Sequence, residues 1–120
     1  MDALIILAHG SRRKASNNEV SELAGKVKAQ AENKYKIVSH AFLELSEPSL
    51  IEAIDDIVAK GISRITVMPY FLNSGTHVTQ DIPNLIEMAQ EKHSDCSFNV
   101  TSCIGMHEDI PKLILKQSDF

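Results

Sequence analysis

Residues 3–7 read ALIIL, are followed by AHGS at residues 8–11, and decide the fold. An apolar run without alternation is typical of a strand that is buried on both faces, as in a parallel sheet. The next segment, residues 15–33, carries apolar side chains at helical spacing. Ser16 or Asn17 is expected to cap the start of that helix. The sequence therefore predicts a strand that leads directly into a helix.

The same alternation of strand and helix continues to the end of the chain. A second helix opens within residues 46–50, with Pro48 expected in its first turn, and Ser49 and Glu52 have the spacing of a capping box. Gly61 suits the left-handed residue that ends this helix. Further strands are expected at residues 35–43, 64–72 and 98–103, and further helices at residues 81–92 and 109–116.

Four strand–helix pairs in succession favour a parallel sheet with right-handed crossovers and helices on both faces. We therefore predict a three-layer α/β sandwich with a four-stranded parallel sheet flanked by helices, in the strand order 2-1-3-4. No segment of the chain has the composition of a linker, so residues 1–120 are expected to form a single domain.

Composition narrows the classes of function. The chain has 120 residues, a formal net charge of −4 and no apolar run longer than a strand, so nucleic-acid binding and a membrane span are not expected. Asp2 follows the first residue without a basic segment, so a signal peptide is not expected either, and the cytoplasm is the expected location. Cys96 and Cys103 match neither a disulfide framework nor a zinc motif and are expected to be packed thiols.

Three side chains with acid–base or metal-binding chemistry follow the first three predicted strands. They are His9, Glu44 and His77. Because ligands of open parallel sheets bind at the carboxyl ends of the strands, we expect these side chains to converge. Two imidazoles and a carboxylate can hold a divalent ion such as cobalt, nickel or iron, or act as bases. Gly10 and Gly75 would let the backbone approach a ligand closely there.

Each of these residues also has a structural explanation. A single histidine at a strand end is commonly structural, and Glu44 is compatible with a solvated carboxylate or a helix-dipole partner. The joint placement of the three favours a functional site. Arg12 and Arg13, next to Lys14, form the one basic triplet. It is interpreted either as a solvated helix start or as a clamp for substrate carboxylates.

The other three histidines have weaker functional interpretations. His40 lies inside a predicted strand and is expected to be packed or hydrogen-bonded. His93 ends a predicted helix, where a cation suits the helix dipole. His107 follows the fourth strand and is a candidate peripheral metal contact.

Three segments together resemble a known family. Residues 4–11 (LIILAHGS), 41–50 (AFLELSEPSL) and 67–83 (VMPYFLNSGTHVTQDIP) are similar, in this order, to segments of the class II sirohydrochlorin chelatases. HGS alone has little specificity, whereas the third segment is specific. The resemblance covers essentially the whole chain. It implies a chelatase-like fold, in which this chain corresponds to one flavodoxin-like half.

The resemblance implies insertion of Co²⁺, Fe²⁺ or Ni²⁺ into a sirohydrochlorin-type tetrapyrrole without ATP, as in the biosynthesis of cobalamin, sirohaem and related compounds. It assigns His9 and His77 to catalysis and metal handling, with Glu44 as their acidic partner. The metal is a co-substrate, and no tightly bound cofactor is implied. This chain has Thr76 directly before His77, where many relatives have glycine or another small residue. Substrate contacts are expected from the loops beside the two histidines, at Gly10, Ser11, Arg12, Arg13, Ser74, Gly75 and Thr76.

Short members of the family assemble as homodimers, so a homodimer is expected here, with residues 69–72 (PYFL) as the candidate contact. A carrier of metal or tetrapyrrole with the same fold and no turnover is the alternative function. Phosphate-ester hydrolysis, with His9 as the nucleophile and Arg12 and Arg13 on the phosphate, is a weaker alternative. The length of the chain and the absence of G-x-S-x-G exclude an α/β-hydrolase.

Overall fold

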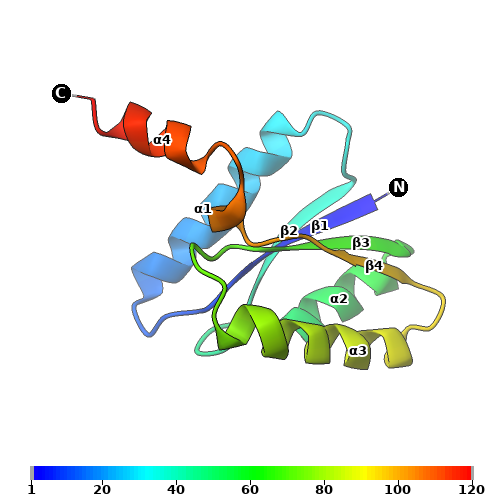
Figure 1. Ribbon diagram of the computed structural model, residues 1–120. Helices are drawn as coiled ribbons and strands as arrows, with labels where there is room; N and C mark the ends of the chain where they lie inside the picture. Colours follow the sequence, from blue (N-terminus) through cyan, green and yellow to red (C-terminus); the bar gives the residue numbers. More distant parts are fainter. Residues whose placement is uncertain (1, 120) are drawn as a thin grey trace.

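Four parallel strands form the centre of the molecule (Figure 1), and their order, β2-β1-β3-β4, is the predicted one. The computed structural model describes residues 2–119, apart from the side chain of His77. β1 occupies the middle of the sheet and pairs in parallel with β2 and with β3, which in turn pairs with β4. The strands are β1 (Asp2–Ala8), β2 (Ile37–Phe42), β3 (Arg64–Pro69) and β4 (Ser97–Val100).

Helices cover both faces of the sheet. Figure 1 shows α1 on one face and α2 with α3 on the other, while α4 projects away from the sheet. The predicted three-layer α/β sandwich is therefore confirmed for α1 to α3. The helices are α1 (Lys14–Gln30), α2 (Leu50–Ala59), α3 (Ile82–Lys92) and α4 (Ile110–Gln117), with a π-helical turn η1 (His77–Asp81) and a 3-10 turn η2 (Ile104–Met106).

The apolar run that opens the chain forms the core as predicted. Ala3, Ile5 and Leu7 are fully buried on the face that α2 and α3 cover. Ile6, on the opposite face, is 2% exposed, so β1 is buried on both sides. Cys96 and Cys103 are free and buried, and the prediction of packed thiols is confirmed.

The second helix begins and ends where its sequence signals lie. The Ser49 hydroxyl accepts from the Glu52 N–H at 3.1 Å, and the Glu52 carboxylate accepts from the Ser49 N–H at 2.8 Å, which is the predicted capping box. Gly61 has φ +88°, the left-handed conformation expected after the helix. Pro48 precedes the N-cap and so does not lie in the first turn, contrary to prediction.

The start of α1 differs from the prediction. Its N-cap is Arg13, without a side-chain cap hydrogen bond, so neither Ser16 nor Asn17 caps the helix. Both lie inside the first two turns instead. The side chain of Asn17 reaches back to the preceding loop, where it hydrogen-bonds the backbone of Ser11.

The remaining differences concern the ends of elements. β3 and β4 are shorter than residues 64–72 and 98–103, although single backbone bonds continue the pairing, from Tyr70 N–H to the Leu7 carbonyl and from Thr101 N–H to the Val67 carbonyl. Apolar residues beyond a strand end have no further ladder partner, so apolar character alone overestimates strand length. None of the helices within residues 2–119 is long and apolar enough to cross a membrane.

Candidate functional site

His9 and Glu44 are brought together where the central strand β1 and its edge neighbour β2 end. Two backbone hydrogen bonds of 3.0 Å continue the β1–β2 pairing past the strand ends, from Leu43 N–H to the Ala8 carbonyl and from Glu44 N–H to the His9 carbonyl. The side chains then meet, with His9 Nε2 and Glu44 Oε1 3.0 Å apart. They are 39% and 54% exposed, so a ligand from solvent can reach both. The expected convergence of these two residues is confirmed.

The orientation of the imidazole bears on its chemistry. His9 Nδ1 lies 3.0 Å from the carbonyl oxygen of Gly10. A carbonyl only accepts hydrogen bonds, so Nδ1 donates. The Glu44 carboxylate also only accepts, so Nε2 faces it either with a proton of its own or, where that proton is absent, with a lone pair. A lone pair and an anion at this distance are stabilised by a cation between them, either a proton or a metal ion.

Gly10 is required by this arrangement. Its φ is +99°, and an added Cβ would lie 1.8 Å from the Glu44 carbonyl oxygen. Gly10 thus permits the chain to turn directly against the segment that carries Glu44. The close approach is to the protein's own backbone. Gly75 has no left-handed φ and no atom within 4 Å of an added Cβ, so the protein's own backbone does not require glycine there, and the close approach of a ligand to Gly75 stays a prediction.

The backbone of His77 begins η1, which leads into α3. Its side chain, and with it the predicted metal role of His77, lies outside the described residues. Ser74, Gly75 and Thr76 are exposed, and the Gly75 carbonyl accepts from the N–H and the hydroxyl of Thr79, at 3.0 Å each. Among the side chains described for residues 2–119, no group of three or more His, Cys, Asp or Glu is arranged to hold a metal ion.

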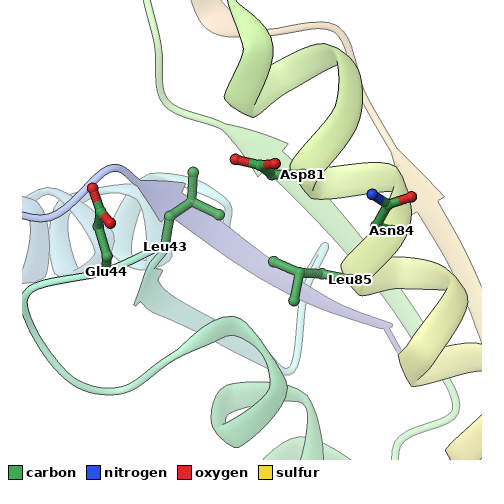
Figure 2. A pocket seen from close by; sticks show the side chains of 5 residues that line it. All are labelled: Leu43, Glu44, Asp81, Asn84 and Leu85. Atoms are coloured by element: carbon green, nitrogen blue, oxygen red, sulfur yellow. The ribbon is translucent and has the colours of Figure 1, made fainter.

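A pocket of about 290 Å³ adjoins Glu44, lined by Leu43, Glu44, Asp81, Asn84 and Leu85. Figure 2 shows Glu44 and Leu43 on one side and Asp81, Asn84 and Leu85 on the other. The volume is at the lower limit of the roughly 300–1,000 Å³ of small-molecule sites. Asp81 and Asn84 are additions to the predicted site. Their i, i+3 spacing at the start of a predicted helix placed them on one face, and this signal was available in the sequence.

The basic residues follow the turn after His9 along the chain. Arg12 and Arg13 are exposed. The Arg13 guanidinium donates to the Ser16 hydroxyl at 3.1 Å, and the Arg13 N–H donates to the Ser11 hydroxyl at 3.0 Å. Part of Arg13 therefore stabilises the start of α1, which supports the helix-start interpretation for that residue.

The other histidines have structural partners. His40 is partly buried, packs edge-to-face on Phe42 with ring centroids 5.6 Å apart, and has a pKa lowered by burial. His107 Nδ1 accepts from the Asp109 N–H at 3.0 Å. His93 Nε2 lies 2.7 Å from Asp55 Oδ1 and so joins α3 to α2.

Asp55 is the charged residue that joins these two helices. Its carboxylate accepts from Lys92 Nζ at 2.7 Å and contacts His93 at 2.7 Å, and these hydrogen bonds hold the pKa of Asp55 below its ordinary value. A lowered carboxyl pKa stabilises the fold above the ordinary pKa, and the contribution is lost as pH falls through the pKa of the folded state. The loss is therefore expected below about pH 4.

Asp55→Asn is expected to lower the free energy of unfolding at pH 7 by at most about 1 kcal/mol, because the carboxylate is partly exposed and screened. Urea unfolding at pH 7 and pH 3 measures the effect, which should shrink at the lower pH. Asp56→Asn is the control, since Asp56 pairs with Lys60, four residues further along the same segment, and that ion pair joins no second helix. Equal stability of Asp55→Asn and the unaltered protein at pH 7 would contradict the role of the cluster.

Comparison with known proteins adds a second line of observation. The CbiX family model matches residues 3–119. The chloroplastic sirohydrochlorin ferrochelatase of Arabidopsis thaliana is 39% identical over 106 residues, which make up 88% of this chain and 46% of that protein. The sirohydrochlorin cobaltochelatase of Methanocaldococcus jannaschii is 39% identical over 93 residues, 78% of this chain and 64% of that protein. The chain thus spans less than two thirds of the length of either relative.

A solved structure extends the similarity to three dimensions. The sirohydrochlorin chelatase SirB from Bacillus subtilis subspecies spizizenii, in complex with cobalt, matches with a TM-score of 0.87 and 27% sequence identity. The match covers 97% of this chain and 49% of the SirB chain.

Proposed function

The chain belongs to the CbiX family of class II sirohydrochlorin chelatases, and we propose that it is an enzyme that inserts a divalent metal ion into a sirohydrochlorin-type tetrapyrrole. The ion replaces two pyrrole protons, so the products are the metallated macrocycle and two protons. No ATP is required in this proposal. The relatives named for cobalt and for iron support both ions as substrates, and nickel remains the third candidate.

The pair of His9 Nε2 and Glu44 Oε1 is the observation that carries the proposal. It offers a lone pair and a negative charge at one exposed point, which suits both an incoming divalent ion and a departing proton. The adjoining pocket and the nearby carboxyl ends of the strands support this proposal, because open parallel sheets bind their ligands at that edge.

We assign roles to residues within this proposal. His9 and His77 handle the metal and accept pyrrole protons, and Glu44 is the third metal ligand. The assignment of His77 rests on the resemblance of residues 67–83 alone. The exposed loops beside the two histidines contact the tetrapyrrole, with the carboxylates of the macrocycle nearest to Arg12. The proposed substrate contacts are Gly10, Ser11, Arg12, Arg13, Ser74, Gly75 and Thr76.

A carrier of the same fold is the alternative, because binding of metal or tetrapyrrole needs no turnover. The test is to incubate the protein with sirohydrochlorin and with Co²⁺, Fe²⁺ or Ni²⁺ separately, and to follow the absorbance of the macrocycle. An enzyme at low concentration metallates many equivalents of tetrapyrrole. A carrier stops at one equivalent or leaves the spontaneous rate unchanged, and that result would overturn the proposed activity.

Glu44→Gln is expected to weaken metal insertion about tenfold, less than loss of a histidine. Glutamine keeps the size of the side chain but has no charge to offer an ion, and its amide can donate to His9 Nε2 without any cation. Steady-state rates over a series of metal concentrations give the measurement. Unaltered rates at every metal concentration would remove Glu44 from the site.

A homodimer is proposed as the working unit. The pocket beside Glu44 is small for a tetrapyrrole, and a second copy would supply an opposite wall. In the candidate contact, Tyr70 and Leu72 are 42% and 71% exposed, while Pro69 is buried and Phe71 packs against the core. Leu72 also lines a groove of about 550 Å³ with Leu113 and Ile114, so the exposed apolar surface continues onto α4.

Sedimentation equilibrium at micromolar concentration is expected to give twice the monomer mass of 13.3 kDa. Leu72→Glu should shift the protein toward monomer, because a carboxylate in an apolar contact is costly to bury. Met88→Glu is the matched control on the solvent side of α3, where Met88 is 57% exposed. A monomer with full activity would contradict the dimer.

The cytoplasmic location and the single domain over residues 1–120 stay predictions.

A further inference from the structure

Asn17 makes two hydrogen bonds to the backbone of Ser11, six residues earlier. Its Oδ1 accepts from the Ser11 N–H at 2.9 Å, and its Nδ2 donates to the Ser11 carbonyl at 2.8 Å. A single orientation of the carboxamide satisfies both bonds. Asn17 itself is held by α1, so the loop that follows His9 is fastened to a rigid helix.

The fastened peptide unit is the one that contacts His9. The Ser11 N–H and the Gly10 carbonyl belong to the same planar unit, and in a trans peptide they point to opposite sides. The N–H side binds Asn17 Oδ1, and the carbonyl side accepts from His9 Nδ1 at 3.0 Å. Because Gly10 has the backbone freedom of glycine, this unit would otherwise rotate readily.

We propose that Asn17 is a positioning residue for His9. Through the Gly10–Ser11 peptide it holds the ring proton on Nδ1, so that Nε2, the nitrogen that faces Glu44, is the one that binds a metal ion. Donation from one ring nitrogen to a carbonyl is the usual way in which proteins fix the tautomer of a histidine that binds a metal through the other nitrogen. The N–H bond to Asn17 also polarises the carbonyl and strengthens its bond to Nδ1.

The expected effect on activity rests on the proposed function, because the tautomer of His9 changes activity only if His9 binds the metal. Asn17→Ala would release the peptide unit and let the neutral ring carry its proton on Nε2, where it blocks metal binding. Loss of such a supporting contact lowers metal affinity or activity by roughly 10- to 100-fold in metal sites. The matched control is Asn18→Ala, since Asn18 is exposed on the same turn of α1.

The direct test is ¹⁵N NMR of protein labelled at histidine, in alkaline buffer where the rings are neutral. Chemical shifts of the two ring nitrogens distinguish the tautomers, and His9 is assigned by its absence in His9→Ala. The comparison is made in a Glu44→Ala background, which removes the carboxylate that competes for a proton on Nε2. The background protein and its Asn18→Ala variant are expected to show the proton on Nδ1, and its Asn17→Ala variant a shift toward Nε2. An unaltered His9 tautomer in Asn17→Ala would overturn the inference.

Asn17→Asp covers the case in which Asn17→Ala fails to fold. Aspartate keeps the oxygen that accepts from the Ser11 N–H but replaces the Nδ2 donor by a second oxygen, which repels the Ser11 carbonyl. It should therefore hold the Nδ1 tautomer less completely than Asn17 does, and an unaltered His9 tautomer in folded Asn17→Asp would also overturn the inference. Co²⁺ titration without tetrapyrrole gives the second measurement. A tautomer change in a protein that shows no chelatase activity would leave the positioning role intact and contradict the proposed function alone.

Discussion

Replacement of His9 by alanine is expected to lower the rate of metal insertion by roughly 100-fold or more, within the range that a positioned acid–base group contributes. The variant loses the lone pair that faces Glu44 at 3.0 Å and leaves that carboxylate without its imidazole partner. The His9 side chain is 39% exposed, so its truncation opens no cavity in the core. Tetrapyrrole absorbance measures the rate, and circular dichroism measures the fold.

His107→Ala is the control for this experiment. His107 is exposed, and its Nδ1 accepts from the Asp109 N–H within its own loop. Its removal should leave the rate close to that of the unaltered protein. A comparable loss is expected for His77→Ala, from the resemblance of its segment. Folded His9→Ala with full turnover would show that His9 has no part in the reaction.

The sheet could be predicted because its signals are local and redundant. The run at residues 3–7 is too apolar to face solvent on either side, and β1 indeed lies in the middle of the sheet with both faces covered. The capping box of Ser49 and Glu52 and the left-handed Gly61 each need only their own few residues. Features of this kind depend on the spacing of residues along the chain and not on distant tertiary contacts.

The convergence of His9 and Glu44 could be predicted for a different reason. Parallel strands end at one edge, so residues that follow β1 and β2 must be neighbours once the strand order is known. The 3.0 Å contact and the direction of the imidazole could not be predicted. They depend on the Gly10 turn and on the Asn17 side chain, which the propensity rules assigned to capping. A side chain that can cap a helix can equally bind another nearby backbone group.

The position of α4 was also beyond sequence reasoning. Ile110, Leu113 and Ile114 have the spacing of a core-facing stripe, yet Leu113 and Ile114 are 56% and 63% exposed. Amphipathic spacing identifies the apolar face of a helix but not the surface that this face contacts.

Gly10→Ala is expected to impair both stability and activity, and more severely than any other glycine substitution near the site. An alanine at φ +99° is strained by about 1–3 kcal/mol. Its Cβ would also lie 1.8 Å from the Glu44 carbonyl oxygen, which is backbone and can yield only if the segment after β2 moves. That movement separates Glu44 from His9, so metal insertion should fall to about the level of His9→Ala. Urea unfolding and the metallation rate together measure the two effects.

Gly25→Ala is the matched control, and it is expected to raise stability where Gly10→Ala lowers it. Gly25 lies inside α1 with no atom within 4 Å of an added Cβ, so alanine should stabilise the helix by about 0.5–1 kcal/mol and leave the rate unaltered. If Gly10→Ala is as stable and as active as Gly25→Ala, then residue 10 and Glu44 do not approach each other closely. If Gly10→Ala instead folds with normal stability but loses turnover, the backbone has adapted and the displaced Glu44 alone accounts for the loss. Retention of both stability and turnover in Gly10→Ala would contradict the proposed geometry of the His9–Glu44 pair.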